Sequence, residues 1–118
     1  MLILNFADNL LRWVLGIIED DPIPVEIKFL YFLIVPDRKG FHIEFGGKEI
    51  KEEVIYHLEY QPLEAEFFLM ELNQPLNEII ALLEEAVDLI YLHDEFLALV
   101  SDKQVFISVY GSGFHVVV

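Results

Sequence analysis

The stretch from residue 26 to residue 45, EIKFLYFLIVPDRKGFHIEF, carries the pattern that decides the fold. Residues 27–35 are apolar at nearly every position, which is typical of a strand covered on both faces. The sequence PDRKG at residues 36–40 has turn chemistry, because proline fixes φ and glycine accepts a positive φ. In residues 41–45 apolar side chains then alternate with His42 and Glu44, as in a strand with one buried face. The stretch therefore predicts a hairpin whose first strand lies at the centre of a sheet.

Helical spacing dominates the segments on either side of this hairpin. Residues 5–18 place their polar side chains three and four apart in one narrow stripe, which predicts a helix with a wide apolar arc. Residues 76–92 repeat apolar side chains at the same spacing and put acids mostly opposite them. Residues 94–100 predict a short further helix with Asp94 as its N-cap. Residues 62–72 predict another, because Pro62 suits a first helical position and Glu64 and Glu66 follow in the first turn.

The remaining segments suit strands. Tyrosines and β-branched residues favour a strand at 53–60, although the wider segment 48–60 also fits a helical stripe. Gly46-Gly47 fits a two-residue turn, and strands are expected at 103–110 and 114–118. We therefore expect a single α+β domain over residues 1–118. It would contain a mainly antiparallel sheet of four or five strands built on a central hairpin (about 26–45), with an N-terminal helix and a longer helix from the C-terminal half packed on it.

Composition excludes several kinds of chemistry. The 118 residues include no cysteine, which rules out disulfides, zinc–thiolate sites and thiol catalysis and suits a cytoplasmic protein. Threonine is absent and serine occurs three times, so hydroxyl nucleophiles are scarce. Residues 1–18 are apolar, but they lack a basic start and a cleavage site, and Asp8 and Arg12 interrupt them. Neither a signal peptide nor a membrane span is expected there.

The charge is strongly negative and uneven. Residues 1–51 carry eight acidic and six basic side chains, whereas residues 52–118 carry thirteen acidic side chains and one base, Lys103, within a total of -14. Such a surface repels nucleic-acid phosphates and anionic membranes and attracts a basic protein or cations. Solubility is the competing explanation, because so apolar a chain needs charge on its exposed face.

Two clusters of polar residues have the residue types of a functional site. His42-x-Glu44 and His57-x-Glu59 offer metal ligands, each pair on one face of its strand. A turn at Gly46-Gly47 would place His42 opposite Lys51 and His57 about 20 Å further along, so neither a metal nor a cofactor is expected. His93 beside Asp94 and Glu95 has the residue types of a general base with carboxylate support, but the N-cap is the simpler explanation.

Three hypotheses about function follow. The first is a non-enzymatic protein-binding module, similar in kind to an immunity protein or an enzyme inhibitor, whose acidic helical surface meets a basic partner. The carboxylates expected to bind that partner are Glu64, Glu66, Glu71, Glu84, Glu85, Asp88, Asp94 and Glu95.

The second hypothesis is a self-associating structural protein, with the apolar arc of the first helix forming a homodimer. Its contact residues would be Phe6, Leu10, Trp13 and Ile17. The third is a small enzyme or ligand binder that uses His42, His57 or His93 in a pocket with carboxylates. It ranks last, because the sequence shows no nucleophile, base and orienting group in a readable arrangement, and no catalytic residue is assigned.

Overall fold

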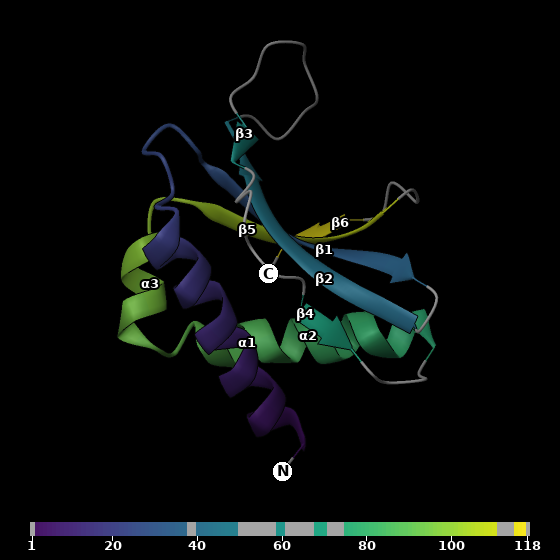
Figure 1. The fold of residues 1–118 in the computed structure, drawn as a ribbon. Coiled ribbons are helices and arrows are strands. Elements are labelled where there is room, and N and C mark those ends of the chain that lie inside the picture. The colour runs from purple at the N-terminus through teal and green to yellow at the C-terminus, as the bar shows by residue number, and fades with distance from the viewer. Residues whose placement is uncertain are drawn as a thin grey trace.

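The computed structural model describes residues 2–37, 40–49, 59–60, 68–70, 75–110 and 115–117, and within them the α+β class is confirmed (Figure 1). The helices are α1 (Leu2–Asp20), α2 (Leu76–Ile90) and α3 (Asp94–Val100). The strands are β1 (Phe29–Asp37), β2 (Gly40–Lys48), β3 (Glu59–Tyr60), β4 (Phe68–Met70), β5 (Gln104–Val109) and β6 (His115–Val117).

The predicted hairpin is present and its first strand is central. β1 and β2 pair antiparallel from Asp37↔Gly40 to Phe29↔Lys48. Gly40 has a φ of 135°, a conformation that side chains other than glycine rarely adopt, which explains a glycine at this end of the turn. β1 lies between β2 and β5, as its nearly continuous apolar sequence predicts.

Within the described residues the sheet is mainly antiparallel, as expected, but it includes the parallel pair β1–β5 and has more strands than expected. The three long strands lie in the order β2, β1, β5, and β5 runs parallel to β1. With the short β3, β4 and β6 the described sheet has six strands, so the expectation of four or five is wrong. A parallel pair needs a long crossover, which the chain supplies through α2 and α3. Side-chain alternation within a strand carries no information on the direction of its neighbour.

Gly46-Gly47 is not a turn. The two glycines lie inside β2, opposite Tyr31 and Leu30 of β1. An added Cβ at Gly47 would lie 2.6 Å from Ile27 Cγ2 and 2.9 Å from the Phe29 carbonyl oxygen. Glycine is therefore required here by the close approach of neighbouring groups, which is the other common reason for a glycine within a strand.

The segment between the hairpin and α2 agrees only in part with its sequence pattern. Glu59–Tyr60 forms β3 on the edge of β2, in agreement with the predicted strand at 53–60. Phe68–Met70 forms β4, opposite Phe41 to Ile43, so the predicted helix over 62–72 is wrong at these residues. Pairing with the edge of β2 overrides the local helix signals there. The other residues of both predictions lie outside the described part of the chain.

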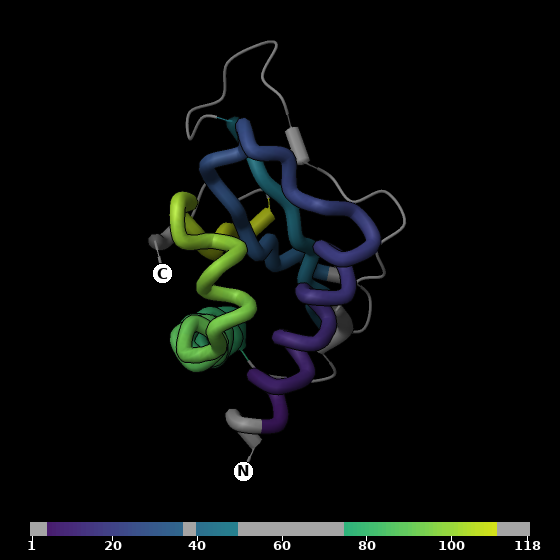
Figure 2. The backbone as a smooth tube through the Cα atoms, turned by 90° about the vertical axis from the view of Figure 1, so that its left-hand side faces the viewer, coloured from purple at the N-terminus to yellow at the C-terminus, as the bar shows by residue number. Residues whose placement is uncertain are grey.

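Helices α1 and α2 pack together beneath one face of the sheet, with α3 leading from the end of α2 up to β5 (Figures 1 and 2). The core between these layers contains Leu10 and Val14 of α1, Leu83 of α2 and Phe32 of β1, all fully buried. α2 buries the face that the sequence predicts, and α3 forms where it was expected. None of the helices in the described ranges is long and apolar enough to cross a membrane.

Candidate functional site

The outer side of α2 and the start of α3 form a surface of carboxylates. We call it the acidic helical surface and define it as Glu78, Glu84, Glu85, Asp88, Asp94 and Glu95. Glu84 is half-buried and the other five are exposed. Residues 75–100 contain no lysine or arginine, and within the described part of the chain none of the six forms an ion pair. Acids without cationic partners along α2 and at the start of α3 give these helices a negative potential.

The phase of α2 explains how this surface forms. Its buried residues recur three and four apart, from Ile79 through Leu83 to Ile90. That spacing turns Glu78, Glu85 and Asp88 to the opposite side. Asp88 lies in the last turn of α2, where the helix dipole disfavours a negative charge and where no base compensates it.

The junction between α2 and α3 differs in one detail from the prediction. His93, not Asp94, is the N-cap of α3, and its side chain forms no capping hydrogen bond. Asp94 and Glu95 are both in the first turn, where their charges favour the positive end of the helix dipole. His93 is exposed, and its carbonyl oxygen accepts a hydrogen bond from the Leu97 amide at 3.0 Å.

Five of the eight carboxylates predicted to bind a partner lie in described helices. Glu84, Glu85 and Asp88 lie on α2, and Asp94 and Glu95 lie at the start of α3. The other three, Glu64, Glu66 and Glu71, lie outside the described residues.

The residues predicted for self-association lie on α1. Phe6, Leu10 and Ile17 are buried in the core, whereas Trp13 is half-buried and packs at its edge. The predicted polar stripe, from Asn5 to Glu19, is exposed, and the apolar arc packs within the protein.

His42 and Glu44 lie side by side on the sheet face that points away from the helices. A hydrogen bond of 3.0 Å joins His42 Nε2 to Glu44 Oε2, and His42 is buried opposite Val35. His57 lies outside the described residues. Where the structure describes the chain, no group of three or more histidine and acidic side chains is placed to hold a metal ion.

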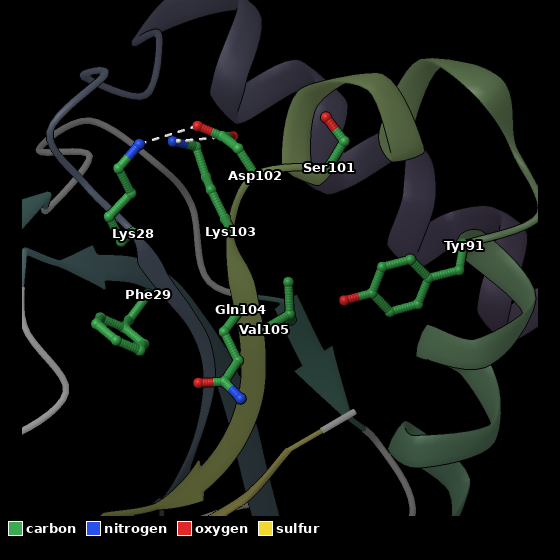
Figure 3. A pocket seen from close by; sticks show the side chains of 8 residues that line it. All are labelled: Lys28, Phe29, Tyr91, Ser101, Asp102, Lys103, Gln104 and Val105. Carbon is green, nitrogen blue, oxygen red and sulfur yellow. Dashed lines mark hydrogen bonds and ion pairs between the residues drawn. The ribbon is translucent and has the colours of Figure 1, made fainter.

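A shallow cleft of about 600 Å³ opens at another place, where β1 and β5 begin (Figure 3). It contains none of the residues selected from the sequence. Its lining consists of Lys28, Phe29, Tyr91, Ser101, Asp102, Lys103, Gln104 and Val105. The Tyr91 hydroxyl points toward the middle of this cleft (Figure 3).

The charged groups of the cleft are engaged with one another. Lys28 Nζ donates to Asp102 Oδ2 at 3.0 Å, and Lys103 Nζ lies 3.6 Å from Asp102 Oδ1. Lys103 also donates to the Ile27 carbonyl oxygen at 2.6 Å, and its side chain is 6% exposed. The hydrogen bond from Lys28, aided by the charges of both lysines, lowers the pKa of Asp102, so this carboxylate stays ionised near neutral pH. These contacts tie the α3–β5 turn to β1, which is a structural role.

Tyr91 links the cleft to the acidic helical surface. Burial raises the pKa of its hydroxyl, and the negative charge of Asp88 adds to the rise. Its ring packs edge-on against Phe96 with centroids 5.5 Å apart. The hydroxyl is therefore protonated at physiological pH.

Sequence reasoning missed Lys28, Asp102 and Lys103. The sequence does offer one signal for Lys103. It is the only base in residues 52–118, and it directly precedes a predicted strand. A single cation in so acidic a segment is a candidate for a buried ion pair. Its hydrogen-bond acceptor, the Ile27 carbonyl oxygen, lies at the other end of the sequence, so this contact could not be predicted.

Comparison of the chain with protein-family models, with curated proteins and with solved structures finds no match. The geometry above is therefore the basis for any functional conclusion.

Proposed function

We propose that this protein is a non-enzymatic binding module whose acidic helical surface binds a basic partner protein, in the manner of an immunity protein or an enzyme inhibitor. One observation carries the proposal: six carboxylates lie in α2 and in the first turn of α3, five of them exposed, and within the described residues none of them has a cationic partner. Some acids elsewhere in the protein are paired with a base, as Asp8 is with Arg12 at 3.0 Å. We also propose a cytoplasmic location, which a chain without cysteine suits.

Charge on a binding surface acts mainly on encounter and on choice of partner. Opposite potentials steer two proteins together and raise the association rate, while similar charges exclude wrong partners. The proposed complex should therefore associate fast at low ionic strength and weaken as salt screens the carboxylates.

A pair of charge-reversed variants tests the proposal. The test variant reverses Glu85→Lys, Asp88→Lys and Glu95→Lys on the acidic helical surface. The control variant reverses Glu19→Lys, Asp20→Lys and Glu26→Lys, which are also exposed and change the net charge equally. Each protein is used as bait in a lysate of the source organism, the bait is washed at low and then at high salt, and both fractions are identified by mass spectrometry.

We expect the wild type and the control variant to retain one stoichiometric basic protein that high salt releases, and the test variant to lose it. With that partner purified, reversal of the three charges should weaken its binding about a hundredfold or more, at roughly 1 kcal/mol or more for each charge. A partner that binds the test variant at full strength would exclude this surface.

Self-association through α1 is a second proposal, and Trp13 is the observation that favours it. Its indole is half-buried at the edge of the core on a helix whose other predicted contact residues lie inside. A Trp13→Ala variant should then sediment as a monomer at concentrations where the wild type is a dimer. A wild-type protein that sediments as a monomer at high concentration would end this proposal.

A further inference from the structure

Three exposed leucines lie in α3 and in the turn that precedes it. Among the large apolar residues that the structure places at the surface, Leu92 is 78% exposed, Leu97 is 46% exposed and Leu99 is 38% exposed. The other two, Val25 and Tyr110, lie far from these in sequence. Single exposed leucines are ordinary, but three within eight residues indicate a contact surface.

The short helix α3 explains why these leucines cannot turn inward. α3 buries Phe96 and Val100, which are four residues apart and share one face. Leu97 and Leu99 flank that face, and Asp94 and Glu95 lie between them on the outer side of the helix. Leu92 precedes α3 in a turn fixed by the hydrogen bond from its amide to the Leu89 carbonyl oxygen at 3.1 Å. The leucines are therefore held on the surface by the fold.

One charge beside the leucines, that of Asp88, is unfavourable to its own helix. Asp88 lies one turn before Leu92, at the negative end of the α2 dipole, and it raises the pKa of Tyr91. A lysine there would favour the helix, yet the segment has none. Sites that break a local rule without a local gain are candidates for function.

We infer that the acidic helical surface and Leu92, Leu97 and Leu99 at its α3 end form one docking surface for a basic amphipathic helix of the partner. This inference rests on the proposed function and adds the partner's chemistry. Carboxylates without cations require lysine or arginine opposite them, and exposed leucines require apolar side chains. A helix with both kinds of residue on adjoining faces supplies them in one segment, whereas a purely basic tail supplies only the charge.

Two labelled probe peptides distinguish these partners. Both have about five helical turns and the same lysines, and one has leucines three and four apart where the other has serines. Fluorescence anisotropy gives the affinity of each for four proteins: the wild type, Leu92→Ser with Leu97→Ser, Glu85→Gln with Asp88→Asn, and Val25→Ser. Val25 is 71% exposed and serves as the control for loss of a surface apolar group. The urea midpoint of each variant shows that its fold is retained.

We expect the wild type and Val25→Ser to bind the leucine peptide about tenfold or more tightly than the serine peptide, which corresponds to burial of part of two leucine side chains. The double leucine variant should abolish that difference, and the double acid variant should weaken binding of both peptides. Equal binding of the two peptides by the wild type would overturn the inference and leave the proposed function standing. Unchanged binding by the acid variant would instead overturn the proposed function at this surface.

Discussion

Two regions of this protein treat charge and packing in opposite ways. The first, which we call the strand junction, consists of residues 27–30, Gly47, Asp102 and Lys103. There each charged side chain has a described partner, and Gly47 leaves no room for a further carbon atom. The second is the acidic helical surface, whose carboxylates have no cationic partner within the described residues. Changes at the junction should therefore reduce stability, whereas changes at the surface should act on binding.

The largest effect on stability is expected from Gly47→Ala. The new Cβ would lie within 3 Å of Ile27 Cγ2 and of the Phe29 carbonyl oxygen, and the second of these is backbone that cannot move aside without disturbing β1. Overpacking of this kind costs about 2–3 kcal/mol, measured as a lower free energy of unfolding in urea.

Gly16→Ala is the matched control for that substitution. Gly16 lies within α1, and an added Cβ there meets no atom within 4 Å. Alanine at this position should raise the free energy of unfolding by about 0.5–1 kcal/mol, because glycine is a poor helix former. A Gly47→Ala variant as stable as the wild type would show that the packing around Gly47 is looser than its distances indicate.

Lys103→Met should have the next largest effect. Methionine keeps an apolar side chain in the same volume but removes the ammonium group that donates to the Ile27 carbonyl oxygen. The loss of this nearly buried, charge-assisted hydrogen bond should cost about 2 kcal/mol in urea unfolding. Lys28→Met removes an exposed ion pair to the same carboxylate and should cost only a few tenths of a kcal/mol. Equal costs for the two lysines would contradict the structural role assigned to Lys103.

The contrast between the two regions also shows what local sequence patterns can predict. The continuous apolar run of β1 predicts a central strand, and the phase of α2 predicts which of its acids face outward, because both depend on one element alone. Gly47, Lys103 and the parallel pairing of β5 could not be predicted, because each depends on a contact between distant segments. The same limit explains Phe68–Met70, whose strand exists through its pairing with β2.

The site was predictable to the same extent. Charge and helical phase predict that Glu84, Glu85 and Asp88 face away from the core side of α2, and the structure places Asp94 and Glu95 in the first turn of α3. Leu92, Leu97 and Leu99 were not selected, because exposure of a leucine depends on what else packs against its helix. Leu97 and Leu99 do lie out of phase with the buried Phe96 and Val100, which is the one signal the sequence offered.

The pH dependence of stability should separate Asp102 from the unpaired acids. Because Lys28 lowers the pKa of Asp102 in the folded protein below its ordinary value of 3.8, Asp102 contributes stability that is present above that value. The contribution is lost as the pH falls through the lower pKa of the folded state. Urea midpoints of the wild type and of Asp102→Asn should therefore differ by a constant amount near neutral pH and converge in acid. The effect is small, because this carboxylate is exposed. A difference that persists unchanged into acid would show that the carboxylate does not stabilise the junction through its charge.

The smallest effect on stability is expected from neutralising one acid at either end of α2. This pair of variants also best separates effects on stability from effects on binding. Asp88→Asn removes a negative charge from the end of the helix where it is unfavourable, so it should raise stability by about 0.3 kcal/mol. Glu78→Gln removes one from the first turn, where it is favourable, and should lower stability by a similar amount. If both carboxylates serve to bind a basic partner, both substitutions should weaken binding of the leucine peptide. If Asp88→Asn raises thermal stability, Glu78→Gln lowers it, and both weaken binding, then Asp88 is retained for the partner at a cost to the fold. Glu78 would then serve both the partner and the fold.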